Sequence, residues 1–249
     1  MILRELNKNP KYNRLLNYAS WASLEHKFLY VETPKAACTK IKQCLQQLCG
    51  LSLPPKGKMP NLHTRDLPEI IFVKKLADYN ETEQAYLLNS KDIFRFCFVR
   101  NPYSRIFSAY KNKIFNDDPQ YLHLHSKIRK DATRLSNNKI SFIDFALFIT
   151  SDKKGSNDHH WGHQHLLLYD NEINYSFIGK FEFFTKDFKF VLKKLKAEKD
   201  VIRTIPDKIN ETPVVGGGLS SYNYELAEIV YQKYRFDFER YNYEKTSWL

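Results

Sequence analysis

A lysine-containing turn lies between a short apolar segment and a helical pattern near the start of the chain. The turn reads Thr33-Pro34-Lys35-Ala36-Ala37-Cys38-Thr39-Lys40. Main-chain N–H groups and the helix dipole make the beginning of a helix attractive to anions. Lys35 and Lys40 add positive charge, Thr39 adds a hydroxyl, and the small Ala36 and Ala37 let an anion approach the main chain. The turn is therefore a candidate anion site, with two solvated lysines on a surface turn as the alternative.

This turn contains no glycine, and the G-x-x-x-x-G-K-[ST] pattern of ATP- and GTP-binding loops is absent. A loop that binds the phosphates of a nucleoside triphosphate is therefore disfavoured, and a nucleotide kinase is disfavoured with it.

A second polar turn, Val99-Arg100-Asn101-Pro102-Tyr103-Ser104-Arg105-Ile106-Phe107-Ser108, repeats this arrangement. Arg100 follows a buried strand pattern, where an unpaired guanidinium is costly. Pro102 favours the start of a helix directly after it. Arg100 and Ser108 can then bind one phosphate, the arginine through two N–H groups and the serine through its hydroxyl. The alternative is a structural arginine paired with a carboxylate.

Apolar segments at 27–33, 92–99 and 175–183 predict three buried strands. Helical patterns follow at 39–48, 103–115 and from a cap at Thr185 to Leu195, with further helices after a capping box at Ser141 and Asp144 and over 224–234. Strand, loop and helix repeated in this order predict an α/β fold with three layers and a central parallel sheet. Ligands of such sheets bind beyond the carboxyl ends of the strands, which is where both polar turns lie.

The composition fits one domain over residues 1–249 with a real core, since 43% of the residues are hydrophobic. The 39 lysines and arginines exceed the 28 acidic residues and give a net charge of +11, which favours an anionic partner. Four cysteines lack the dense spacing of a disulfide scaffold. No apolar run is long enough for a membrane span or a signal peptide, so we expect a cytoplasmic protein, with peripheral membrane contact left open.

Together the two turns resemble the signature of carbohydrate sulfotransferases that use 3′-phosphoadenosine 5′-phosphosulfate (PAPS), the branch with chondroitin 4-type enzymes and bacterial relatives. A third matching element comprises Asp158-His159-His160-Trp161, Gln164 and Ile178-Gly179-Lys180-Phe181-Glu182. The sequence departs from the family at Asn101, where animal enzymes usually carry an acidic residue, and at His163, where the family has proline. The resemblance spans roughly residues 28–195, and the absent cysteine framework and anchor favour a bacterial-type enzyme.

The resemblance implies a P-loop-like sulfotransferase fold and PAPS as the sulfuryl donor, with no metal required. It implies that residues 34–39 bind the 5′-phosphosulfate and that Arg100 and Ser108 bind the 3′-phosphate. Lys35 would stabilise the leaving phosphate during in-line attack by a hydroxyl. The implied acceptor is a carbohydrate or polysaccharide, and the basic charge makes an acidic glycan a reasonable choice. A lipid, peptide or small-molecule alcohol is an alternative acceptor.

Two histidines compete for the role of general base, which removes the proton of the acceptor hydroxyl. His63 lies in the irregular segment after the first helix and is the preferred candidate. His160 belongs to the third element and has a structural role as its alternative, and Glu32 and Glu182 are further candidates. Four histidines between 159 and 165 invite a metal hypothesis, but no accompanying cluster of cysteines or carboxylates has ligand spacing, so we expect no metal site. A non-enzymatic nucleic-acid-binding protein is a remote alternative, because no common module for nucleic acids is present.

Overall fold

The computed structural model describes residues 6–50, 73–131, 139–151, 158–205 and 219–249. The chain divides into two compact units. The first, here called the sheet unit, comprises Met1–Val99 and Leu168–Ile209. The second, the helical unit, comprises Arg100–Leu167 and Asn210–Leu249. That residues 1–249 form a single domain stays a prediction.

The sheet unit contains a four-stranded mixed sheet of order β1-β2-β3-β4. Its strands are β1 Ser20–Ser23, β2 Phe28–Val31, β3 Phe94–Val99 and β4 Phe177–Lys180. β2, β3 and β4 are parallel, with Val31 opposite Cys97 and Val99 opposite Lys180, whereas β1 pairs antiparallel with β2. The carboxyl ends of β2 and β3 are therefore neighbours at one edge of the sheet.

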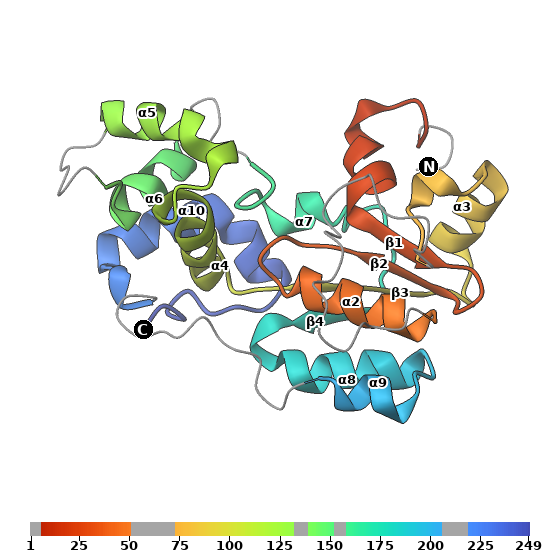
Figure 1. Ribbon diagram of the computed structural model, residues 1–249. Helices are drawn as coiled ribbons and strands as arrows, with labels where there is room; N and C mark the ends of the chain where they lie inside the picture. Colours follow the sequence, from red (N-terminus) through yellow and green to blue (C-terminus); the bar gives the residue numbers. More distant parts are fainter. Residues whose placement is uncertain (1–5, 51–72, 132–138, 152–157, 206–218) are drawn as a thin grey trace. The chain divides into compact units, whose positions relative to one another are not determined.

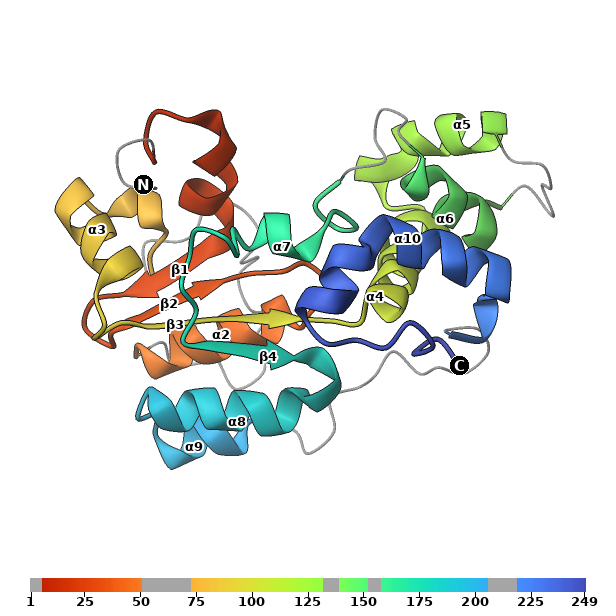
Figure 2. The same cartoon turned by 180° about the vertical axis from the view of Figure 1, so that it is seen from behind.

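Helices lie on both sides of this sheet (Figures 1 and 2). α2 (Cys38–Leu48), α8 (Phe184–Lys194) and α9 (Lys199–Arg203) lie on one side, and α3 (Glu81–Asn89) lies on the other. Alternate strand residues Phe28, Tyr30, Phe96 and Phe98 pack against the apolar faces of α2 and α8. A Cβ atom at Gly179 would overlap the Phe98 ring, so β4 requires glycine there to approach β3 closely.

The helical unit is built from α4 (Pro102–Ala109), α5 (Leu122–Asp131), α6 (Phe142–Thr150), α7 (Gln164–Leu167) and α10 (Tyr224–Arg240). A π-helical turn, Tyr110–Phe115, continues α4. Aromatic residues dominate the core, which includes the fully buried Tyr103, Phe145 and Trp161. The longest helix, α10, is interrupted at Tyr234, whose main chain is not helical.

Short 3₁₀ or π-helical turns complete the described chain. They are Pro10–Tyr12, Leu15–Ala19, Leu76–Asp78, Pro119–Tyr121, Phe181–Phe183 and Leu219–Ser221. None of the described helices is both long and apolar enough to cross a membrane.

The α/β class, the three predicted strands and their parallel pairing are confirmed. The antiparallel strand β1 was not predicted, because Ser20-Trp21-Ala22-Ser23 is short and only half apolar. The predicted strand at 175–183 is shorter in the structure, where Phe181–Phe183 form a 3₁₀ turn. The cap predicted at Thr185 is wrong: α8 begins at Phe184 after Phe183, and Thr185 lies in its first turn.

Candidate functional site

The turn after β2 begins an 11-residue helix with an unusual main chain. Lys35 and Ala37 both have left-handed conformations, with φ of 70° and 62°. This region is sterically costly for residues other than glycine and is found mostly where the surrounding structure enforces it. Ala37 is the N-cap of α2 and offers no side chain to bond the first N–H groups of the helix. This helix N-terminus therefore presents its N–H groups without a competing side-chain cap.

Two features of the turn fit an anionic ligand. The hydroxyl of Thr33 is fully buried and has no hydrogen-bond partner in the part of the chain that the structure describes. Ala36 is fully buried as well, so the turn packs closely on the sheet unit while Lys35 stays half-buried. A buried hydroxyl without a partner beside a helix N-terminus suits a phosphate or sulfate oxygen. The residues present therefore fit the phosphosulfate end of PAPS.

Cys38 is the first residue of α2. Burial raises the pKa of its thiol, and the Glu32 carboxylate adds to the rise. The thiol is therefore protonated at neutral pH and suits packing within the turn rather than nucleophilic chemistry.

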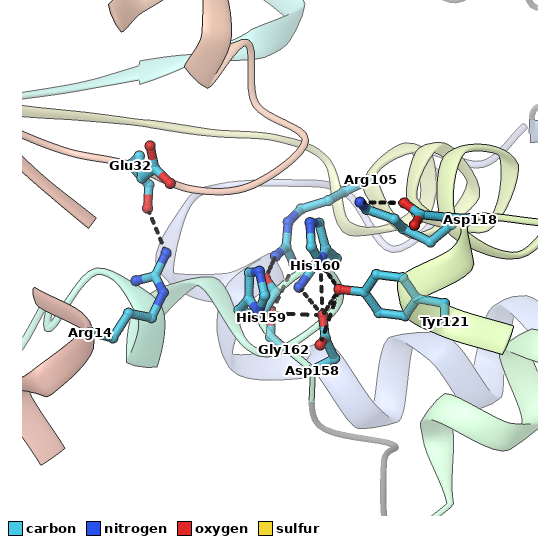
Figure 3. Close-up of polar contacts among 10 residues, drawn as sticks. Arg14, Glu32, Arg105, Asp118, Tyr121, Asp158, His159, His160 and Gly162 are labelled. Atoms are coloured by element: carbon cyan, nitrogen blue, oxygen red, sulfur yellow. Dashed lines mark hydrogen bonds and ion pairs between the residues drawn. The ribbon is translucent and has the colours of Figure 1, made fainter. Parts of the chain in front are cut away.

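A buried group of charges surrounds Glu32, directly before this turn. Lys42 of α2 has a fully buried side chain and places Nζ 3.0 Å from Glu32 Oε2, and Trp21 Nε1 donates to the same oxygen over 3.2 Å. Arg14 donates to the Glu32 carbonyl over 3.0 Å (Figure 3). Burial acts to raise the pKa of Glu32, but Lys42, Lys75 and Arg14 outweigh it and hold this pKa below its usual value. An ion-paired, ionised Glu32 fits a structural role better than that of a general base.

Lys75 is the least usual member of this group. Its Nζ donates to the Tyr18 carbonyl over 2.6 Å and lies 3.2 Å from the centroid of the Trp21 ring. Burial lowers the pKa of Lys75 to about 7, against the attraction of Glu32. Neither Lys42 nor Lys75 was singled out from the sequence, since isolated lysines outside a motif usually lie in solvent.

In the helical unit, Arg100 leads directly into the N-terminus of α4. The Arg100 Nε donates to Ser104 Oγ over 2.9 Å, and Asn101 caps the helix by accepting from the Tyr103 N–H over 3.0 Å. Ser104 and Ser108 are four residues apart, so they lie on one face of α4, and both are half-buried. Ser104 is thus an additional hydroxyl beside Arg100 that the motif comparison had not marked.

His160 lies in a network of polar side chains in the helical unit (Figure 3). Its Nδ1 is 2.8 Å from Asp158 Oδ1 and 2.7 Å from the Tyr121 hydroxyl, which is itself 3.3 Å from Asp158 Oδ2. Because an ionised carboxylate only accepts, these partners place the proton on Nδ1 and leave Nε2 unprotonated. Burial lowers the pKa of His160 to about 4, although the Asp158 hydrogen bond acts to raise it. His160 is therefore neutral at pH 7, with Nε2 able to accept a proton.

A buried arginine holds the segment that carries these histidines. Arg105, 1% exposed, donates to the carbonyls of Gly162 over 2.8 Å and His159 over 3.1 Å. Tyr234 of α10 donates its hydroxyl to the Trp161 carbonyl over 2.6 Å. Residues 159–162 are thus bound to α4 and α10 through their main-chain carbonyls, which the linear motif did not reveal.

Folding brings carboxylates to the histidines in two places. Asp158 joins His159 and His160, and Asp237 joins His163 and His165, with ligand atoms within 4.8 Å of one another in each group. The sequence analysis had found no accompanying cluster with ligand spacing: Asp158 is a single carboxylate next to His159 in the sequence, and Asp237 is distant from His163 and His165. In both groups the carboxylate already accepts main-chain N–H groups. That no metal binds stays a prediction.

Each predicted site residue lies on one of the two units or outside the described residues. The sheet unit carries Pro34, Lys35, Ala36, Ala37, Cys38, Thr39 and Lys40, gathered at the start of α2. The helical unit carries Arg100, Ser108 and His160. His63, the preferred general base, lies outside the described residues. The structure thus describes one of the two competing histidines.

A family model described as "Sulfotransferase family" matches residues 18–244. Carbohydrate sulfotransferase 14 of Danio rerio is 30% identical over 185 residues, which cover 71% of this chain and 48% of the relative. Carbohydrate sulfotransferase 11 of Danio rerio is 27% identical over 247 residues, covering 90% of this chain and 67% of the relative. Carbohydrate sulfotransferase 9 of Homo sapiens is 27% identical over 235 residues, with 88% and 52% covered.

The chain therefore spans about half to two thirds of the length of these relatives. No solved structure gives a significant match. The family match covers the turns after β2 and β3, the histidine segment and α10, and on this ground the chain belongs to the sulfotransferase family.

Proposed function

We propose that this protein transfers a sulfuryl group from PAPS to a hydroxyl of a carbohydrate. The observation that carries the proposal is the glycine-free turn with left-handed Lys35 and Ala37 at the uncapped start of α2, beside the buried hydroxyl of Thr33. Such a turn suits a tetrahedral anion, and the carbohydrate sulfotransferases similar to this chain support the substrate class.

In this proposal the donor is bound by two groups of residues. Residues 34–40 bind the 5′-phosphosulfate through main-chain N–H groups and Lys35. Arg100 and Ser108 bind the 3′-phosphate, and Ser104 orients the guanidinium through the bond to Nε. When bound, PAPS supplies the sulfuryl group and a phosphate leaving group. Lys35 stabilises the negative charge that develops on that leaving group.

His63 is the proposed general base, with His160 as its competitor. The pKa of about 4 makes His160 a weaker base than an ordinary imidazole, although its Nε2 stays unprotonated at neutral pH. His160→Ala and His63→Ala should therefore differ. The variant that keeps its fold and its donor affinity while losing transfer identifies the base.

Calorimetric titration with 3′-phosphoadenosine 5′-phosphate, the expected product, beside AMP and ATP tests the donor site. We expect the bisphosphate to bind far more tightly than AMP or ATP. Equal or absent binding of all three would overturn the proposal, and salt-sensitive binding to DNA would then favour a nucleic-acid-binding protein. Transfer of radioactive sulfate from labelled PAPS to desulfated glycosaminoglycans, compared with simple alcohols, tests the acceptor class.

Two further expectations stay predictions. Residence in the cytoplasm is tested by cell fractionation, with antibody against the full chain. Independence from metal is tested by measuring transfer in the presence of a chelator, where a loss of activity that zinc restores would contradict it.

A further inference from the structure

Both main-chain groups of Arg100 are bound by a single side chain. Gln164 accepts the Arg100 N–H at Oε1 over 2.9 Å and donates from Nε2 to the Arg100 carbonyl over 2.8 Å. The Gln164 side chain that makes both bonds is fully buried, and Arg100 is half-buried. The Gln164 amide thus bonds the N–H and the carbonyl of Arg100, as the main chain of a neighbouring strand would, at the first residue after the end of β3.

Gln164 is in turn held from α10. The carboxylate of Asp237, fully buried, accepts the N–H of Gln164 over 2.7 Å and the N–H of His165 over 3.0 Å. The same carboxylate lies 2.6 Å from His165 Nδ1. Asp237 therefore caps the short helix α7 and fixes the main chain from which the Gln164 side chain extends.

The next residue is fixed independently. Asn101 donates from Nδ2 to Ser247 Oγ over 2.7 Å, in addition to capping α4. The bonds from Gln164 and the contacts of Asn101 leave the Arg100 main chain little freedom, and the bond from Arg100 Nε to Ser104 Oγ orients the guanidinium. A guanidinium that starts from a fixed main chain loses less entropy when it binds a phosphate.

We propose that Gln164, held by Asp237, is a positioning residue that fixes the main chain of Arg100 so that its guanidinium is preorganised for the 3′-phosphate of the donor. The inference rests on the proposed function. A purely structural role of the same contacts would lower stability without changing the preference for a nucleotide with a 3′-phosphate.

The test compares the affinities for 3′-phosphoadenosine 5′-phosphate and for AMP, which lacks the 3′-phosphate, by calorimetry. Gln164→Met keeps the length of the side chain and removes both hydrogen bonds. We expect this substitution to lower the affinity for the bisphosphate by about tenfold and the affinity for AMP by less than about twofold. Gln232→Met, on the exposed surface of α10, is the matched control and should change neither affinity. Equal weakening of both nucleotides, or of neither, by Gln164→Met would overturn the inference.

A double-mutant cycle tests whether Gln164 affects bisphosphate affinity through Arg100. In an Arg100→Ala background, Gln164→Met should cause no further loss of bisphosphate affinity, because the group that it positions is gone. A full additional loss would show that Gln164 acts by another route. Asp237→Asn should reproduce the selective loss in weaker form, and an unchanged preference would remove Asp237 from the proposal.

Two further measurements keep the test decisive. If Gln164→Met does not fold, Gln164→Leu replaces it, since it also removes both hydrogen bonds, and the same selective weakening of bisphosphate binding is expected. If the unchanged protein does not prefer the bisphosphate, the proposed function fails on its own. Hydrogen exchange of the Arg100 amide then decides the contact, with faster exchange in the variant supporting it and unchanged exchange overturning it.

Discussion

The turn after β2 and the turn after β3 both lead from a parallel strand into a helix, but they differ in main-chain conformation and in helix capping. The first, at Lys35 and Ala37, adopts a left-handed main chain without glycine and exposes an uncapped helix N-terminus. The second, at Arg100 and Asn101, has ordinary main-chain angles and a capped helix, and side chains from distant segments bind it. In the proposed function the first would offer main-chain N–H groups to the donor, whereas the second would offer the Arg100 side chain from a fixed main chain. The two turns should therefore respond differently to the same kinds of substitution.

The largest difference should appear on removing the cation of each turn. Lys35→Ala should lower kcat on the order of 100-fold and nucleotide affinity much less, because the proposed role of the lysine is to stabilise charge that develops during transfer. Steady-state kinetics and calorimetry measure the two effects, with Lys193→Ala on the exposed side of α8 as the control. Equal losses in kcat and affinity would contradict the assignment.

Arg100→Ala should act on affinity instead. We expect binding of the bisphosphate to weaken by about 10- to 100-fold and binding of AMP to change little, since the guanidinium is proposed to bind the 3′-phosphate in the ground state. Arg100→Lys should recover part of this loss, because it keeps the charge and loses the paired N–H groups. An equal loss for both nucleotides would assign Arg100 to another part of the site.

The buried charges next to the first turn predict a pH dependence that the second turn lacks. Lys75 has a pKa of about 7 in the folded protein, below the ordinary lysine value. Between these values the unfolded chain binds a proton that the folded chain does not, so this residue makes the free energy of unfolding rise with pH.

The rise due to Lys75 should reach about 1 to 2 kcal/mol from pH 7 to pH 8.5. Urea unfolding of the unchanged protein and of Lys75→Met at both pH values isolates the contribution of Lys75, because the cysteines with raised pKa values contribute equally in the two proteins. An identical pH dependence of the two proteins would place the lysine in solvent.

The smallest effects should have opposite signs. Ala37→Gly should stabilise the protein by up to about 1 kcal/mol, since glycine adopts the left-handed conformation without strain. The greater conformational freedom of glycine in the unfolded chain offsets part of this gain. Asn101→Gly should destabilise it by about 1 kcal/mol, because the bond to Ser247 is lost. Thermal unfolding of both variants measures the two changes in stability. A change of the same sign in both variants would contradict the proposed difference between the turns.

The sequence predicted the three parallel strands because each is a short apolar run next to a turn. It marked the turns after β2 and β3 as candidate anion sites because their polar residues are contiguous, and anion binding there stays a prediction. It did not reveal the contacts that hold the second turn. Gln164 and Asp237 are separated by more than seventy residues, so although Gln164 belongs to the third matching element, its contacts with Asp237 and Arg100 have no local signature. The left-handed angles of Lys35 and Ala37 were hidden as well, because lysine and alanine rarely adopt them.

The division of the sheet unit along the chain also affects how the protein is made. β3 ends at Val99 and its partner β4 begins at Phe177, so the intervening helical segment is synthesised before β3 acquires its second neighbour. Until then the nascent chain carries an open apolar edge, which readily pairs with other chains. The close fit of Gly179 against Phe98 closes that edge. Gly179→Val should therefore reduce the soluble yield in cells, measured as the fraction of expressed protein in the supernatant.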